Sequence, residues 1–235
     1  MKRVGMWPSG KAHGFGPCIR GFESLHPSQA IIINKLQDSQ MIKDLINDYL
    51  EYFPDEKEKL ILALNQANQA KSDDEIIDRK NFTGHFIASA FVVSLQDKTV
   101  LLLNHKSLNL LLQPGGHIDQ GENPFQAAIR ELKEETGLDS NNLEYYPFEP
   151  ENNLLPFNIN SHFIPENKKE NEPGHYHYAF EYLFFANSER NIRIDLAEST
   201  DFQWASWEDF FAQKHTKKSA CKIEKLLTRK LAKSK

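Results

Sequence analysis

The sequence predicts a mixed α/β domain. Short apolar runs with strand-like texture occupy much of residues 81–206, one amphipathic helix interrupts them, and helical patterns lie near both ends of the chain. With 235 residues, 40% of them apolar, the chain can bury a substantial core. This length fits one large domain with extensions.

The first 40 residues are predicted to be an unstructured leader, because Met1–Ser28 is rich in Gly, Pro and His and has little periodicity. The stretches WPSGKA and GFES can be encoded by sequences that resemble the D arm and the T arm of a transfer-RNA gene. We therefore hypothesise that this segment is conceptual translation of such a gene and that Met41 is the true start. An ordinary flexible leader is the alternative. A phosphate-binding loop fails on spacing, because Ser9-Gly10-Lys11 lacks the upstream glycine. N-terminal sequencing of the native protein tests the hypothesis.

A helical extension is predicted over 41–80. Apolar residues recur at three- and four-residue spacing until Pro54 breaks the pattern, and a second helix follows. Two apolar runs, 85–94 and 98–104, are then joined by Gln96-Asp97, which indicates a hairpin. The remaining predicted elements are a helix over 124–136 that stops at Gly137, strands within 142–148, 157–165, 175–186 and 201–206, a short helix from Trp207, and a basic helix within 214–235.

Charge and cysteine content exclude several classes of protein. A net charge of −5 gives no overall attraction to nucleic acid or to an anionic membrane. Only Cys18 and Cys221 are present, so a disulfide scaffold or zinc knuckle is not indicated and the cytoplasm is predicted. The apolar runs are too short to span a bilayer, and no signal peptide is evident.

The helix over 124–136 carries an unusual concentration of acid. Glu131, Glu134 and Glu135 stand three and four residues apart, so their carboxylates rise from one face. Like charges at this spacing destabilise a helix, and the last turn of a helix prefers cations. A hard divalent cation with oxygen ligands, such as Mg²⁺ or Mn²⁺, would remove both penalties.

This segment resembles the Nudix box, GX5EX7REUXEEXGU with U aliphatic. Every fixed position is present with its spacing: Gly116, Glu122, Arg130, Glu131, Leu132, Glu134, Glu135, Gly137 and Leu138. The resemblance covers about 81–213, to a poorly characterised bacterial group, and implies an α/β/α sandwich with a mixed sheet. The N-terminal helices and the basic tail lie outside it.

The resemblance implies hydrolysis of a nucleoside diphosphate linked to another moiety, with Mg²⁺ or Mn²⁺ as cofactor. Gly116, Glu131, Glu134 and Glu135 are the implied metal ligands, the glycine through its carbonyl. Glu131, Glu134 and Glu198 form the implied catalytic set together with Arg130, which orients a glutamate by ion pairing. Glu131 and Glu198 are alternative general bases. For Glu198, an exposed loop acid without a catalytic role is an equally favoured interpretation.

Five histidines fall near strand ends or the box loop: His85, His117, His162, His175 and His177. They could recognise phosphate or hold a second metal, and His117 is the best candidate for substrate binding. Separate strand-edge histidines with ordinary hydrogen bonds are the favoured interpretation. The lysine-rich tail is interpreted as the solvent-exposed face of an amphipathic helix, with contact to RNA or to an acidic partner as the alternative.

Two other functions compete with hydrolysis of a small nucleotide. A nucleotide-sensing binding module is the first, although the box is intact and no helix-turn-helix is evident. RNA decapping, aided by the basic tail, is the second. The sequence leaves the exact substrate and the oligomeric state open, and both nucleotide-pool cleaning and ADP-ribose cleavage remain possible.

Overall fold

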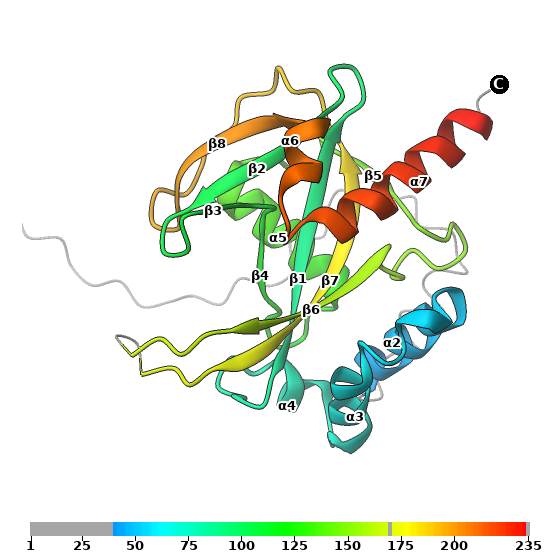
Figure 1. The fold of residues 1–235 in the computed structure, drawn as a ribbon, viewed down its shortest axis with the longest axis vertical. Coiled ribbons are helices and arrows are strands. Elements are labelled where there is room, and N and C mark those ends of the chain that lie inside the picture. Colours follow the sequence, from blue (N-terminus) through cyan, green and yellow to red (C-terminus); the bar gives the residue numbers. More distant parts are fainter. Residues whose placement is uncertain (1–39, 169–170, 234–235) are drawn as a thin grey trace, which may run out of the picture. The chain divides into compact units, whose positions relative to one another are not determined.

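An eight-stranded mixed sheet organises the described part of this computed structural model, residues 40–168 and 171–233 (Figure 1). The predicted leader and the transfer-RNA hypothesis fall almost entirely on residues 1–39, which lie outside the described residues. The predicted hairpin is confirmed, since β1 (His85–Ser94) pairs antiparallel with β2 (Thr99–His105).

The sheet runs in the order β3-β2-β1-β7-β5, and three further strands pair with β1, β7 and β2. Strands β1 and β7 are parallel and pair from His85↔His177 to Val93↔Phe185. The other pairings are antiparallel. The strands not yet bounded are β3 (Leu110–Leu112), β4 (Gly115–His117), β5 (Glu144–Tyr146), β6 (Asn158–Ile164), β7 (His175–Phe185) and β8 (Ser199–Ser206).

The predicted helices all form, and Pro54 separates the first two of them as expected. The short α4 was not predicted. The helices are α2 (Met41–Tyr52), the 3-10 helix η1 (Pro54–Glu56), α3 (Ile61–Gln69), α4 (Asp73–Ile77), α5 (Pro124–Thr136), α6 (Trp207–Ala212) and α7 (Lys217–Lys233). Within the described ranges, no helix combines the length and apolar character needed to cross a membrane.

Alternation along β1 separates two cores, one on each face of the sheet. Phe86, Ala88 and Val92 belong to the core shared with α2, α3, α4 and α5. Phe91 and Val93 point to the other face and belong to the core that α6 and α7 complete. Figure 1 shows α5 behind the sheet and α7 in front of it. This arrangement confirms the predicted α/β/α sandwich.

The apolar stripe of α7 confirms the amphipathic interpretation of the tail for the residues that can be described. Ala220 and Ile223 are fully buried and Leu226 is nearly so. Full burial of one large aliphatic side chain contributes about 1.5–3 kcal/mol. Beside this stripe, Lys222 makes an ion pair of 2.6 Å with Glu56 of η1.

A buried acid also links α7 to the sheet. Glu181 of β7 accepts hydrogen bonds from Ser219 of α7 (2.6 Å) and from Asn158 of β6 (2.8 Å), all through Oε2. Its Oε1 is buried and has no hydrogen-bond partner among the described residues. Burial raises the pKa of the Glu181 carboxyl above its ordinary value of 4.5.

We expect Glu181→Gln to gain stability relative to the native chain as the pH rises. Because the folded state holds the Glu181 proton more tightly than the unfolded chain, this group's contribution to stability falls as the pH rises from about 4.5 toward the folded-state pKa. Glutamine does not titrate. Urea unfolding at about pH 5 and about pH 8 measures the difference, and identical pH dependence of the two proteins would contradict the prediction.

Candidate active site

The acidic helix α5 begins and ends at strong local signals. Asn123 caps its N-terminus in a reciprocal pair with Gln126, and Pro124 occupies the first turn. Gly137 ends it in the left-handed conformation, with φ of 73°. Ala128 and Leu132 are fully buried against the sheet. The apolar face therefore fixes which side of α5 its glutamates occupy.

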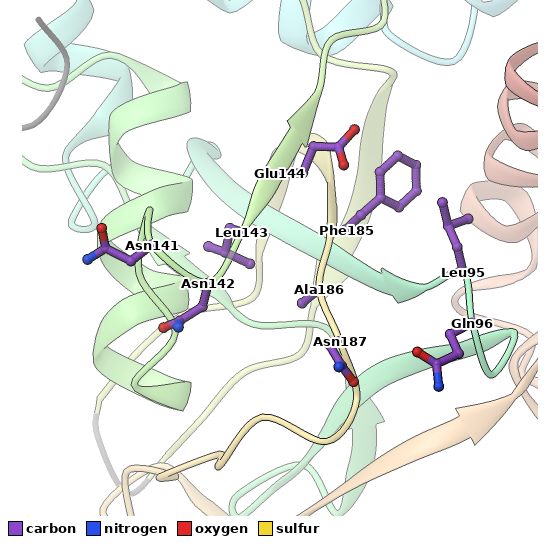
Figure 2. Close-up of a pocket in the computed structure, with 9 residues that line it drawn as sticks. All are labelled: Leu95, Gln96, Asn141, Asn142, Leu143, Glu144, Phe185, Ala186 and Asn187. Atoms are coloured by element: carbon purple, nitrogen blue, oxygen red, sulfur yellow. The ribbon is translucent and has the colours of Figure 1, made fainter. Parts of the chain in front are cut away.

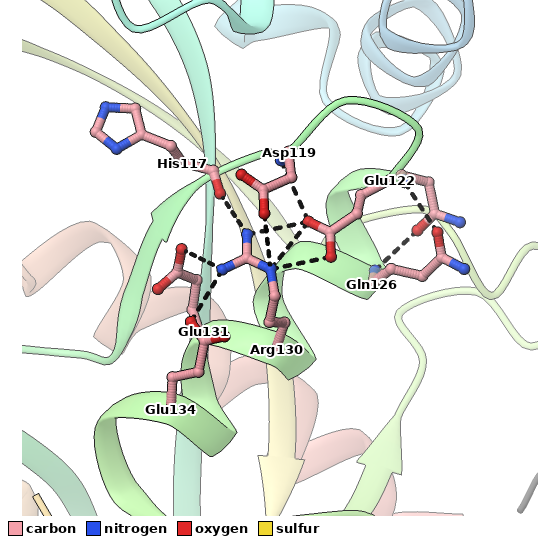
Figure 3. A network of polar contacts seen from close by, with 8 residues as sticks. His117, Asp119, Glu122, Gln126, Arg130, Glu131 and Glu134 are labelled. Atoms are coloured by element: carbon pink, nitrogen blue, oxygen red, sulfur yellow. Dashed lines mark hydrogen bonds and ion pairs between the residues drawn. The ribbon is translucent and has the colours of Figure 1, made fainter. Parts of the chain in front are cut away.

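Arg130 gathers the acids of the box around one guanidinium (Figure 3). Its Nε donates to Glu122 at 2.9 Å, and its Nη1 donates to both Glu131 (2.8 Å) and Glu134 (3.1 Å). Since one nitrogen serves both, the carboxylates of Glu131 and Glu134 are neighbours. The sequence analysis did not identify a fourth acid of this network, the exposed Asp119, whose Oδ2 lies 3.6 Å from the Nε of Arg130.

The loop before α5 is held by the same network. Glu122 Oε2 accepts from the backbone N–H of Asp119 at 3.2 Å, and Arg130 Nη2 donates to the carbonyl of His117 at 2.8 Å. Strand β4 in turn pairs antiparallel with β1, with Gly116 opposite Ala88. Arg130 thus connects the helix, the loop and the sheet.

Two consecutive glycines bring β4 close to the acids. A Cβ on Gly116 would lie 2.6 Å from the Cδ of Glu131, so a larger residue would occupy the space of that carboxylate. The backbone N–H of Gly115 donates to Glu135 Oε1 at 3.3 Å. The chain therefore passes directly beside two of the predicted ligands.

We expect Gly116→Ala to lower activity while leaving the fold intact. The new methyl group would push the Glu131 carboxylate, which is the movable end of a side chain, and such displacements cost about 10- to 100-fold in rate. Gly115→Ala is the matched comparison, because its Cβ would meet the backbone of Ala88 and Ser89 at 2.6–2.7 Å.

Gly115→Ala is therefore expected to lose about 1–3 kcal/mol of unfolding free energy. Thermal unfolding and steady-state kinetics of both variants test whether Gly116→Ala mainly loses activity and Gly115→Ala mainly loses stability. Equal loss of stability in the two proteins would contradict this prediction.

Glu198 lies close enough to the box for its charge to act on it. The residue is exposed in the loop before β8, and its carbonyl accepts from the Lys106 N–H at 2.8 Å. Its negative charge contributes to the raised pKa values of Glu131 and Glu135. The loop that carries this late acid reaches the acidic helix, since the Asp195 N–H donates to the Glu135 carbonyl at 3.3 Å and the Glu198 N–H donates to the Asp195 carbonyl at 3.2 Å.

Burial is the main cause of the shifted pKa values in the box. Burial, together with the charges of Glu198 and Glu131, raises the pKa of Glu135 to about 8 against the opposing effect of the Gly115 N–H. Burial also raises the pKa of Glu131, although Arg130 opposes this effect. Acids with raised pKa values that share one site repel each other, and a cation would relieve that repulsion.

The favoured interpretation of separate histidines is wrong. Nε2 of His117 lies 3.1 Å from Nε2 of His85, and Nε2 of His175 lies 3.1 Å from Nε2 of His177. The His162 ring centroid is 5.6 Å from that of His177. These side chains converge because β1, β4, β6 and β7 are neighbours in the sheet, which local sequence cannot reveal.

His117 contributes to both the Arg130 network and the group of histidines, through different atoms. Its carbonyl accepts from Arg130, whereas its ring points away from the Arg130 network in Figure 3 and contacts His85. Alternation along β4 explains this, since Gly116 faces α5 and the next residue faces the opposite side of the sheet. The substrate-binding role of His117 stays a prediction.

A separate depression of about 380 Å³ lies at the other end of β1 (Figure 2). No box residue lines it, so it is not a candidate active site. Its lining residues are Leu95, Gln96, Asn141, Asn142, Leu143, Glu144, Phe185, Ala186 and Asn187.

Comparison with known proteins decides the family. The family model described as NUDIX domain matches residues 85–226, which is more than half of the chain. The chain belongs to the Nudix family. It is therefore a Nudix hydrolase, a class that acts on phosphoric anhydride bonds.

Among curated Nudix relatives, a probable DHNTP pyrophosphohydrolase of Lactococcus lactis subsp. cremoris is 31% identical over 143 residues, covering 61% of this chain and 78% of that protein. A putative 8-oxo-dGTP diphosphatase of Bacillus subtilis is 39% identical over 56 residues, which cover 23% of this chain and 38% of that protein. Among solved structures, the binary complex of a C. elegans Ap4A hydrolase is 23% identical, with a TM-score of 0.47 and coverage of 61% and 97%.

Proposed function

We propose that this Nudix hydrolase is a divalent-metal-dependent pyrophosphohydrolase that cleaves a nucleoside diphosphate linked to another moiety. The observation that carries the proposal is the gathering of Glu131, Glu134 and Glu135 on one helix face beside Gly116, with Glu198 approaching from a distant loop. Such a concentration of carboxylates is costly unless a cation compensates it.

The residues present fit a hard cation. Glu131, Glu134 and Glu135 offer carboxylate oxygens, which suit Mg²⁺ and Mn²⁺. A Cβ at Gly116 would collide with the Glu131 carboxylate, so glycine lets the strand backbone pass beside that acid. We propose these four residues as the metal ligands, with Glu134, whose side chain is 58% exposed, on the solvent side.

When bound, Mg²⁺ or Mn²⁺ would neutralise phosphate oxygens and lower the pKa of a bound water. The side chains have separate tasks. Arg130 holds Glu131 and Glu134 in position and links them to the loop through Glu122. This fixed arrangement supplies the orientation on which phosphoryl transfer depends.

We propose Glu198 as the general base, with Glu131 as the alternative. Water attacks phosphorus, the bridging P–O bond breaks, the released phosphate takes the bond electrons, and the water proton passes to the carboxylate. Glu198 is exposed and therefore accessible to water, whereas Arg130 already holds Glu131. A general base must lie within hydrogen-bond reach of the attacking water, which an exposed carboxylate at the site allows.

The substrate we propose is a small nucleoside triphosphate or a related nucleotide. The names of the Lactococcus and Bacillus relatives, which refer to DHNTP and 8-oxo-dGTP, support this class. We propose the cytoplasm as its location, since the chain has two cysteines in 235 residues.

A substrate panel with and without Mg²⁺ or Mn²⁺ tests the function. The panel contains DHNTP, 8-oxo-dGTP, ADP-ribose, a dinucleoside polyphosphate and capped RNA, and the cleavage products of each are separated and identified by chromatography. We expect metal-dependent turnover of one small nucleotide. Nucleotide binding without turnover would instead support a sensing module, and preferred turnover of capped RNA, weakened steeply by salt, would support decapping.

A further inference from the structure

A group of imidazoles lies on the sheet face opposite α5. Parallel pairing places His85 opposite His177, and alternation places His175 on the same face as His177. One ring nitrogen from each of His85, His175 and His177 lies within 4.8 Å of the other two. These residues begin β1 and β7, so two strands from distant parts of the sequence supply the group.

The hydrogen bonds of the rings determine where their lone pairs point. His175 Nδ1 lies 2.8 Å from the carbonyl oxygen of Pro173, and His85 Nδ1 lies 3.4 Å from that of Asn81. A carbonyl only accepts, so in both neutral rings Nδ1 carries the proton and Nε2 carries a lone pair. Metal-binding histidines typically have this backing, in which the nitrogen remote from the ion donates to a carbonyl.

The lone pairs point into the group and not toward solvent. His85 is 1% exposed and His175 is 5% exposed. Nε2 of His175 faces Nε2 of His177 at 3.1 Å, and Nε2 of His85 faces that of His117 at the same distance. The Nε2 atoms of these rings therefore face one another inside the group.

A small pocket of about 80 Å³ opens beside these nitrogens. The four rings line it together with Ile164, Arg79 and Glu172, and the last two form an ion pair of 3.8 Å at its wall. The pocket gives an ion a place near the nitrogens. The Glu172 carboxylate offsets the positive charge of Arg79 at this wall.

We propose that His85, His175 and His177 bind a divalent transition-metal ion of the Zn²⁺ class. Neutral imidazole prefers Zn²⁺ and its neighbours among the transition metals, whereas Mg²⁺ prefers oxygen ligands. Three histidines satisfy three positions of a tetrahedral ion and leave the fourth for water or an anionic group. The site uses none of the carboxylates of α5, so it is independent of the proposed hydrolysis.

Calorimetric titration of the tag-free, EDTA-treated chain with Zn²⁺, in saturating Mg²⁺, tests the site. We expect one ion per chain for the native protein and affinity weaker by about 100-fold or more in His175→Asn/His177→Gln. His105→Asn, at a half-buried position of β2 outside the group, is the matched control for loss of an imidazole, and it should bind as the native protein does. Glu135→Gln should also retain Zn²⁺ binding, which separates this site from the acids of α5.

X-ray absorption at the zinc edge of the native chain gives an answer that does not depend on how the variants fold. We expect an inner shell of nitrogen with the outer scattering of about three imidazoles. An oxygen-dominated shell, no stoichiometric binding by the native chain, or unchanged binding by the double variant would each overturn the proposal. Loss of Zn²⁺ binding in Glu135→Gln would overturn the separation of the two sites.

Discussion

Glu135→Gln should lower kcat/KM for the metal-dependent reaction by about 1,000-fold, which corresponds to about 4 kcal/mol of lost transition-state stabilisation. The substitution removes a charge at the proposed metal site. It also keeps an oxygen that can accept from the Gly115 N–H, which Glu135 Oε1 does in the native chain. The fold should therefore persist, and the loss should appear in the kinetics.

The control for this experiment is Glu189→Gln, an equal change of charge at an exposed position in the loop after β7. It should leave both kcat/KM and the apparent affinity for Mn²⁺ near native. Circular dichroism and thermal unfolding establish that all three proteins are folded. Native-like turnover by folded Glu135→Gln would remove this residue from the mechanism.

Arg130→Met should destabilise the protein by about 2–3 kcal/mol. Removing one partner of a buried ion pair costs about 3–5 kcal/mol, and the value is smaller here because solvent reaches part of the network. Arg130 is 25% exposed and Glu131 13% exposed in their side chains. The variant leaves Glu122 and Glu131 without their cation, and it also removes the donor to the His117 carbonyl.

Arg130→Lys is expected to recover only a small part of this loss. Lysine keeps the charge, but a single ammonium cannot reproduce the planar fork that reaches Glu122, Glu131 and a backbone carbonyl together. Urea unfolding in EDTA compares the two variants with the native protein. The exposed Arg190→Met serves as the control. If both Arg130 variants unfolded at the native urea concentration, the network would contribute nothing to stability.

Local patterns were sufficient to predict the elements that carry the acids. The spacing of Glu131, Glu134 and Glu135 and the stop at Gly137 depend only on neighbouring residues, and α5 has these bounds in the structure. The two cores could also be anticipated in outline, because strand alternation and helix periodicity are local properties. The roles assigned to the individual site residues stay predictions.

Contacts between distant strands could not be predicted in the same way. The gathering of His85 and His177 depends on the parallel register of β1 and β7, which lie about ninety positions apart in the chain. Nothing near Glu181 in sequence points to Ser219, although an acid between Phe180 and Tyr182 was a signal that could have been noticed. Packing of α2 on the same core as α5 likewise emerges only in three dimensions.

The bond from Arg130 to residue 117 ends on a peptide carbonyl and not on the imidazole. Any replacement of the side chain at this position keeps that backbone acceptor, while it removes the contact with His85. Substitution of His117 therefore changes the side of β4 that faces the histidine group and keeps the hydrogen bond from Arg130 to the backbone. A kinetic defect in such a variant would report on the ring alone.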